Sequence, residues 1–159
     1  MEKEGYISNE LKIVAFKLKN ENYGVPINQV LSIEKLQEFT RVPHTFDFVK
    51  GVMNLRGIIV PVIDLQKRFS IGEVLSESDA RIIIVEAESI TAGLLVDAAK
   101  EVISIDQDMI IDTPEIVGGP EVDYIHSVAK IGENDLLILL NLSKVLSLEE
   151  IEAIKAIEA

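Results

Sequence analysis

The stretch FVKGVMNLRGIIVPVIDLQKRF (residues 48–69) decides the fold. Residues 51–55 and 58–63 are apolar runs separated by Arg56-Gly57, where glycine can supply the positive φ of a tight hairpin turn. Pro61 interrupts the second run and cannot donate to a ladder, so we expect that strand at a sheet edge or with a bulge. Asp64 fits the N-cap of a short helix, LQKRF. The stretch therefore predicts a β-hairpin followed by a helix.

Arg56, in the predicted turn, allows two interpretations. Most surface arginines are solvated and have no special task. A planar guanidinium in a hairpin turn could instead bind a carboxylate bidentately, on a partner or within the protein. The local residues favour the first interpretation.

Length and composition predict a globular protein. A chain of 159 residues fits one domain or two small subdomains that share a core. The chain is 48% apolar and 26% charged, and its mean hydropathy of +0.27 predicts many strands that are apolar on both faces. It has no cysteine, so no disulfide framework is expected.

The charge balance excludes several classes of partner. With 27 acidic and 15 basic residues, the formal net charge is −12, which argues against binding to nucleic acid or to an anionic membrane. The apolar segment LLILLNLS (136–143) is far shorter than the roughly 20 residues that span a bilayer. The N-terminal MEKEGYISNE lacks the apolar core of a signal peptide. We expect a cytoplasmic protein without direct membrane insertion.

Catalytic and metal-binding patterns are scarce in the sequence. Only His44 and His126 could serve as near-neutral bases, and each is far from any nucleophile motif. The nearest acidic cluster lacks the glycine turn of a calcium loop, and we interpret it as a solvated loop: Asp106, Asp108, Asp112 and Glu115. We therefore expect no enzyme activity, no metal and no cofactor.

The remaining pattern predicts mostly strands. We expect hairpins from 11–18 with 23–27, from 81–86 with 92–96, and from 124–131 with 136–141. Residues 28–35 fit either a short helix with Asn28 as N-cap or a strand. Other segments are interpreted as one aromatic turn (46–49), a loop (70–79), a helical turn (97–101), a short strand (102–105), an irregular connection (106–123) and a C-terminal helix (143–158).

Two parts of the chain are similar to each other. IIVPVIDLQKRF (58–69) and LLILLNLSKVL (136–146) share a strand, then Asp or Asn, Leu, one residue and Lys. Each follows a predicted hairpin turn. This repetition predicts two small barrels rather than one open sheet.

The sequence resembles the CheW-like family of chemotaxis coupling proteins. The resemblance rests on YGVPI (23–27) with Val30, the segment 42–65, AGLLVD (92–97) with EVISI (101–105), YIHSVAK (124–130) and LLILLNLSKVL. It implies a mainly β fold of two small five-stranded SH3-like β-barrels packed together, with a C-terminal helix at 143–158. It also implies a single domain over 1–159, with approximate subdomains 10–80 (with a C-terminal return) and 81–142.

The resemblance implies a non-catalytic adaptor. Such an adaptor links the cytoplasmic tip of methyl-accepting chemoreceptors to the regulatory domain of the CheA histidine kinase, at membrane-associated receptor arrays. The receptor-binding residues implied by motif are Val30, Gly51, Arg56, Ala99 and Val102. The residues alone favour ordinary core positions for Val30 and Val102. No motif locates the kinase contacts, which we expect on an exposed edge of the second barrel.

The chain departs from the family pattern at three positions. Ser32 stands where many relatives have an acid, so we do not expect the nearest acid, Glu34, to pair with Arg56. Ser127 stands where glycine is frequent, and Asn141 where aspartate is frequent.

Two other functions remain open on the sequence. One is a CheW-like coupling module that serves a non-chemotaxis sensory kinase. The other is a small-ligand-binding or hydrolytic β-barrel, which would need a pocket with convergent polar groups and a perturbed His44 or His126.

Overall fold

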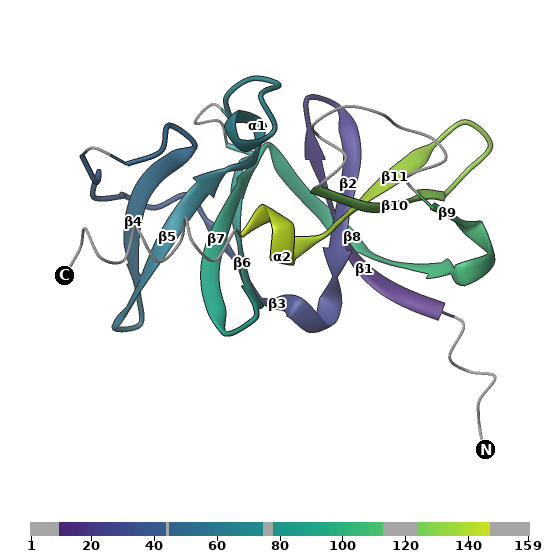
Figure 1. Cartoon of the computed structure of the whole chain (residues 1–159), viewed down its shortest axis with the longest axis horizontal. Helices are drawn as coiled ribbons and strands as arrows, with labels where there is room; N and C mark the ends of the chain where they lie inside the picture. The colour runs from purple at the N-terminus through teal and green to yellow at the C-terminus, as the bar shows by residue number, and fades with distance from the viewer. Residues whose placement is uncertain (1–9, 44, 75–77, 113–123, 147–159) are drawn as a thin grey trace, which may run out of the picture.

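The described residues of the computed structural model, 10–43, 45–74, 78–112 and 124–146, form two β-sheets that lie next to each other (Figure 1). The six-stranded sheet has the order β8 (Ala98–Asp106), β1 (Glu10–Leu18), β2 (Glu21–Pro26), β11 (Leu136–Leu140), β10 (Ile125–Lys130), β9 (Ile110–Asp112). The five-stranded sheet has the order β3 (Val30–Lys35), β6 (Arg81–Ala87), β7 (Ile90–Val96), β5 (Ile58–Asp64), β4 (Val49–Leu55). The prediction of a mainly β fold is confirmed.

The helices in the described residues are short. They are α1 (Leu65–Arg68), α2 (Leu142–Val145) and the 3₁₀ turns η2 (Ile27–Gln29) and η3 (Gln107–Met109). The predicted N-cap is confirmed, because Asp64 Oδ1 accepts hydrogen bonds from the backbone N–H groups of Gln66 (3.0 Å) and Lys67 (3.3 Å). Beyond α2, the predicted C-terminal helix lies outside the described residues.

A hairpin followed by a short helix occurs at both places that the internal similarity indicated. The β4–β5 hairpin leads into α1, and the β10–β11 hairpin leads into α2. The last strand of each hairpin also has a parallel neighbour: β5 pairs with β7, and β11 pairs with β2.

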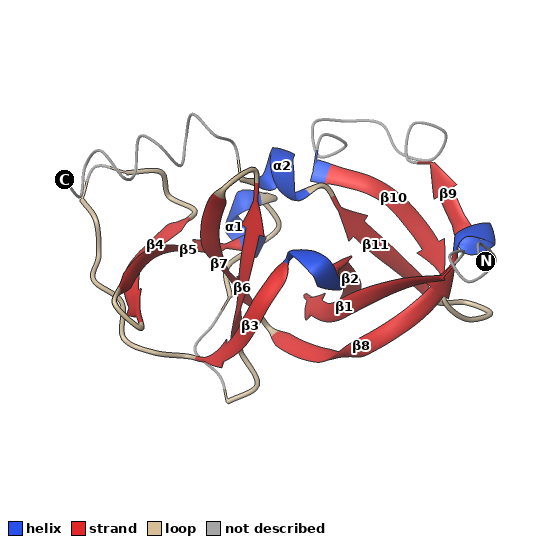
Figure 2. Cartoon of the chain, turned by 90° about the horizontal axis from the view of Figure 1, so that it is seen from below, coloured by secondary structure: helices blue, strands red, loops and turns tan. Residues whose placement is uncertain are grey.

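The two sheets are not built from consecutive halves of the chain. After β2 in the six-stranded sheet, the chain passes through η2 and enters the five-stranded sheet as β3 (Figure 2). It returns at Asp97, the single residue between β7 and β8. As a result, the five-stranded sheet is built from the continuous segment β3–β7, which lies in sequence between β2 and β8 of the six-stranded sheet.

The apolar core has two parts that share β1. Val14, Phe16 and Leu18 pack into the larger core, which contains residues from both sheets. Ile13 and Ala15 pack into a smaller core within the six-stranded sheet. Both faces of β1 are therefore buried, which explains why its polar and apolar residues alternate only in part.

The structure decides between the two alternatives for residues 28–35. Residues 30–35 are strand β3, with only η2 before it, and Pro26 rather than Asn28 stands at the N-cap position of η2. The helical turn expected at 97–101 was wrong, because strand β8 covers residues 98–106 and includes the strand expected at 102–105. The strand β9 lies within the expected irregular connection. β8 pairs with β1 over most of its length and β3 pairs with β6, so ladder hydrogen bonds override the local helical pattern.

The strand that carries Pro61 was expected at a sheet edge or with a bulge. It is not an edge strand, because β5 lies between β7 and β4, and the bulge of this hairpin lies on β4 between Val49 and Gly51 rather than at Pro61. Val52 of β4 lies opposite Pro61. The backbone N–H and carbonyl of Val52 both bond to the backbone of Thr40, at 2.8 Å each, so they form no hydrogen bond with Pro61. The nitrogen of Pro61 therefore faces the β7 side, where pairing begins only at Val62. Pro61 is tolerated inside the sheet because no ladder bond requires its missing N–H.

Candidate functional site

The β4–β5 turn presents Arg56 to solvent. Arg56 (φ 51°) and Gly57 (φ 88°) both adopt left-handed conformations, as a two-residue hairpin turn requires. Asn54 Oδ1 accepts a hydrogen bond from the Gly57 N–H at 2.9 Å and fixes the turn. The Arg56 side chain is 74% exposed.

Arg56 has a carboxylate partner within the protein. Its Nη2 lies 3.6 Å from Oε2 of Glu34 on β3, whose side chain is only 17% exposed. The expectation that Glu34 would not pair with Arg56 was therefore wrong. β3 and β4 are opposite edges of the five-stranded sheet, so this contact requires the sheet to curl until its two ends approach each other.

The strand β3 alternates between inward and outward side chains. Val30 is half-buried and packs against the larger core, opposite Val85 of β6. Leu31 and Ile33 point the other way and are 57% and 46% exposed. The outer face of β3 is therefore apolar and free in the described part of the chain.

Gly51 is a packing position. A Cβ built on Gly51 would lie 2.4 Å from the carbonyl oxygen of Thr40, and its φ of 151° disfavours other residues. Glycine thus permits the close bridge between Thr40 and Val52. It offers no side chain to a partner.

Ala99 and Val102 lie on β8, the edge of the other sheet. Ala99 is half-buried opposite Phe16. Val102 is 48% exposed opposite Val14, so it is not an ordinary core valine. Because β6 contacts both β3 and β8, the structure brings the two edge strands near the same strand. The receptor-binding residues that the sequence implied are divided between the two sheets.

The sequence interpretation missed an exposed apolar cluster on the six-stranded sheet. A shallow groove of about 450 Å³ is lined by residues of η3, β9 and the β10–β11 turn, among them Met109, Ile111 and Ile131. Leu136, at the start of β11, is also exposed. The acids around Met109 suggested a solvated loop and concealed the strand that displays this cluster.

The titratable groups with shifted pKa values have structural explanations. Burial raises the pKa of Asp64, although hydrogen bonds from the N–H groups of Val74, Lys67 and Gln66 oppose the shift. Burial also raises the pKa of Tyr23. A hydrogen bond from Lys50, 2.9 Å away, lowers the pKa of Glu73.

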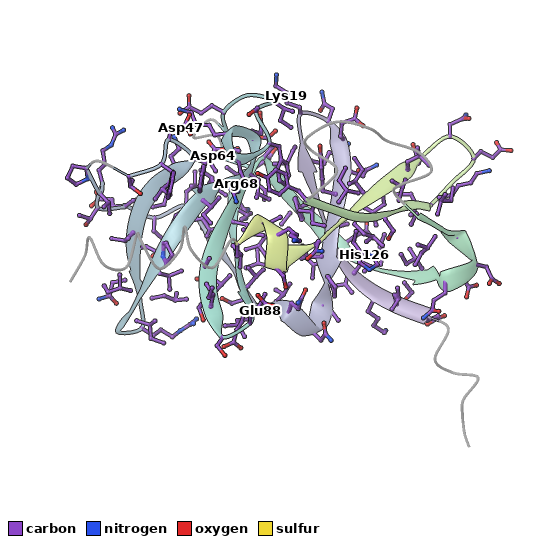
Figure 3. The ribbon with its side chains drawn as sticks, in the orientation of Figure 1. Lys19, Asp47, Asp64, Arg68, Glu88 and His126 are labelled. Carbon is purple, nitrogen blue, oxygen red and sulfur yellow. The ribbon has the colours of Figure 1, made fainter. Side chains whose placement is uncertain are left out.

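These groups do not assemble a catalytic or metal site in the described residues. His126 is exposed and its Nδ1 lies 3.0 Å from Ser127 Oγ, far from Asp64 (Figure 3). His44 lies outside the described residues. Across residues 10–43, 45–74, 78–112 and 124–146, no group of three His, Cys, Asp or Glu side chains could hold a metal ion. Over the same ranges, no helix has the length and apolar character needed to cross a membrane.

Comparison with known proteins assigns the family. The model of the CheW-like domain matches residues 12–150. The chain is 38% identical over 138 residues to the chemotaxis protein CheW of Bacillus subtilis, covering 87% of this chain and 88% of the relative. It is 35% identical over 139 residues to that of Klebsiella aerogenes, covering 87% and 83%.

A solved structure agrees with these relatives. The crystal structure of the scaffolding protein TtCheW from Thermoanaerobacter tengcongensis superposes with a TM-score of 0.79 at 41% sequence identity, over 86% of this chain and 92% of that one. The chain belongs to the CheW-like domain family.

Proposed function

We propose that this protein is a non-catalytic chemotaxis adaptor that couples methyl-accepting chemoreceptors to the regulatory domain of the CheA histidine kinase, so that receptor state controls kinase activity. Membership of the CheW-like domain family supports this proposal. The protein would act in the cytoplasm at membrane-associated receptor arrays, without a cofactor. The observation that carries the proposal is the match of the CheW-like domain over residues 12–150, and the exposed Arg56 at the β4–β5 turn offers a partner contact.

The receptor surface would combine the start of β3 at the half-buried Val30, the β4–β5 turn and the β8 edge. Val30, Arg56, Ala99 and Val102 would contact a receptor helix, and Gly51 would support the hairpin from beneath. The guanidinium of Arg56 has one carboxylate neighbour at 3.6 Å and remains largely exposed, so it can also bind a carboxylate of the receptor. Glu34 would keep the guanidinium directed toward that partner.

The kinase surface would be the exposed apolar cluster of Met109, Ile111, Ile131 and Leu136. Exposed apolar side chains beside an unpaired strand edge are typical of docking surfaces, and β9 is such an edge. Two separate surfaces would allow one molecule to hold receptor and kinase together. Each contact then raises the effective concentration of the other partner, even where each alone is weak.

We also propose that the chain is one domain of two subdomains, each closed into a small SH3-like barrel. The contact between Arg56 and Glu34 supports closure of the five-stranded sheet, because it joins opposite ends of that sheet. The subdomains would then be defined by the strands of each sheet, and the boundary between them would not lie near residue 80.

The test of the receptor surface is a calorimetric titration of a chemoreceptor signalling-tip fragment with the variant Arg56→Glu. Reversal of the charge removes the guanidinium and places two carboxylates together at the hairpin tip. We expect the receptor affinity to fall at least about tenfold, a change of about 1.4 kcal/mol. Lys12→Glu is the matched control, because it makes the same charge change at an exposed residue of β1.

Normal receptor binding by a folded Arg56→Glu protein would contradict this surface. A wild-type protein that binds a sensory kinase of another pathway, and neither chemotaxis partner, would instead identify a coupling module for a non-chemotaxis kinase. A wild-type protein that binds neither the chemotaxis partners nor another sensory kinase would favour the alternative of a small-ligand-binding β-barrel.

A further inference from the structure

A polar contact joins the two sheets at the point where the chain passes from one to the other. Asp97 is the single residue between β7 of the five-stranded sheet and β8 of the six-stranded sheet. Its backbone N–H donates to the carbonyl of Lys17 on β1 (3.1 Å), and its Oδ2 accepts from the backbone N–H of Lys19 (2.8 Å). Asp97 is thereby fixed to the β1–β2 hairpin.

The other side of this contact comes from the five-stranded sheet. Gln66 lies in α1, directly after β5, and its Nε2 donates to Oδ1 (2.8 Å) and Oδ2 (2.7 Å) of Asp97. The Gln66 side chain is only 2% exposed. We name Gln66, Asp97 and the Lys19 N–H the clasp; Asp64 caps the helix that carries Gln66.

The clasp is a specific arrangement with a cost. Gln66 Oε1 is buried and has no hydrogen-bond partner in the described structure. A buried acceptor without a partner is unfavourable. An apolar side chain of similar size would fill this space without that cost, so packing alone does not explain a glutamine at position 66. The orientation of Gln66 is explained by its two hydrogen bonds to Asp97, which place the donor group against the crossover residue.

A second contact of α1 joins the sheets on its other side. Arg68 Cζ lies 4.3 Å from the ring centroid of Phe48, before β4, and 5.0 Å from that of Tyr124, before β10. Its Nε also donates to the carbonyl of Val145 in α2 (3.2 Å). The helix α1 therefore makes directional contacts with both halves of the molecule.

Directional contacts matter here because the apolar core cannot set an angle alone. The larger core contains residues of both sheets and holds them together, but apolar burial is non-directional. A hydrogen-bonded contact at the boundary is directional and therefore favours one arrangement.

We propose that the clasp positions the two parts of the receptor-binding surface relative to each other. This inference rests on the proposed function. Val30 and Arg56 belong to the five-stranded sheet, whereas Ala99 and Val102 belong to β8, which begins directly after Asp97. A receptor helix that contacts both groups requires one fixed orientation of the sheets. Gln66 and Asp97 are positioning residues in this account, because they would touch no partner.

The first experiment measures the orientation of the sheets directly. The chain has no cysteine, so Glu88→Cys and Glu133→Cys place one spin label in the β6–β7 turn and one in the β10–β11 turn. We expect one narrow distance distribution in the labelled wild-type background. Gln66→Met keeps the side-chain length but removes both hydrogen bonds, so we expect a broadened or shifted distribution.

Two further variants make this result specific. Gln66→Glu with Asp97→Asn exchanges donor and acceptor, and we expect it to restore the narrow distribution. Glu73→Ala is the matched control, because Glu73 lines the same polar cavity as Gln66 and Asp97 but pairs with Lys50 of β4, within one half of the molecule. It should leave the distribution unchanged.

The second experiment measures binding of the same variants. Gln66→Met should weaken binding of a receptor-tip fragment at least about fivefold, the lower range of typical coupling between sites. Affinity for the kinase regulatory domain should stay within about twofold, because the proposed kinase surface lies entirely on one sheet. The exchanged double variant should regain receptor affinity.

The outcomes separate the clasp from the proposed function. A wild-type distance distribution in folded Gln66→Met would overturn the clasp, as would unchanged receptor affinity in a variant whose distribution has broadened. If Gln66→Met fails to fold, Asp97→Asn, which keeps one acceptor oxygen, should give an intermediate broadening, and an unchanged distribution in it would equally overturn the clasp. A wild-type protein that binds neither partner would refute the proposed function, while the distances would still decide the clasp.

Discussion

Asp64 is fully buried, and its two carboxylate oxygens bind different segments. Oδ1 caps α1 through the N–H groups of Gln66 and Lys67, and Oδ2 accepts from the N–H of Val74 at 2.9 Å. One side chain thus fixes both the start of the helix and the loop that follows it. Because Gln66 is in that helix, Asp64 also determines where the clasp lies.

The variant Asp64→Ala should destabilise the protein by about 2–4 kcal/mol. Loss of an N-cap costs about 1 kcal/mol. A buried N–H without an acceptor, here that of Val74, costs about 1–3 kcal/mol more. Urea denaturation measures the difference, and a loss below about 0.5 kcal/mol would contradict this role of the carboxylate.

The pH dependence of that difference has a definite sign. Because burial raises the pKa of Asp64 in the folded protein above its ordinary value of 3.8, the folded state binds the proton more readily than the unfolded state. The stability advantage of wild type over Asp64→Ala should therefore increase as the pH falls from the raised pKa to about 3.8, and then remain constant. Denaturation of both proteins across this range checks it, and a decreasing advantage would show that the hydrogen bonds outweigh burial. Glu73, whose pKa is shifted down, is present in both proteins and cancels.

At the scale of elements, the β4–β5 hairpin depends on a close approach at its base. Gly51 lies against Thr40, which forms a bridge with Val52. At the tip, a Cβ built on Gly57 would meet nothing within 4 Å. The two glycines of the hairpin are therefore required for different reasons, one for space and one for the turn.

Gly51→Ala should destabilise the protein by about 2 kcal/mol or more, because the new methyl group collides with a backbone carbonyl and the left-handed φ adds strain. Gly57→Ala is the matched control and should cost about 1 kcal/mol, since only its backbone conformation is unfavourable. Thermal unfolding compares the two. Equal losses of stability in the two variants would contradict the packing role of Gly51. Because Gly51 offers no side chain to a partner, any weaker receptor binding by Gly51→Ala should be explained by its lower stability.

The elements differ in how well the sequence predicts them. The hairpin around Arg56-Gly57 and the cap at Asp64 were predictable because turn and cap residues act locally. β3 and β8 were predictable only in part, as one of two alternatives for 28–35 and as a strand over 102–105, because they are edge strands whose pairing partners, β6 and β1, are distant in sequence. The sequence did not predict that β5 lies inside the sheet, because proline usually indicates an edge strand. Proline is excluded from a central strand only where its missing N–H would have to form a ladder hydrogen bond.

At the scale of the whole molecule, the insertion of one sheet into the sequence of the other makes the two sheets interdependent. β3 follows β2 of the six-stranded sheet, and β8 follows β7 of the five-stranded sheet. The aromatic rings of Phe16, Tyr23, Phe69 and Tyr124 form a series of neighbouring pairs across the boundary, with centroids 5.2–6.0 Å apart; the first two pairs are stacked and the last is tilted. Neither sheet can therefore move far without disturbing the other.

The candidate site was predictable only in part, for the same reason. A motif singled out Arg56, but its contact with Glu34 depends on curvature of the sheet, which no local pattern specifies. The exposed cluster around Met109 depends on β9 joining the sheet edge. The clasp joins Gln66 to Asp97, 31 residues apart, across a crossover that is visible only in three dimensions.

The central claim is that one molecule holds a receptor and the kinase together through separate surfaces. Analytical ultracentrifugation of the protein with a chemoreceptor signalling-tip fragment and the CheA regulatory domain tests it most directly. We predict two binary complexes and a ternary complex, with Arg56→Glu weakening receptor association in the ternary complex at least about tenfold while the complex with the kinase persists. Mutually exclusive binding of the two partners, or a ternary complex that Arg56→Glu leaves intact, would contradict this account.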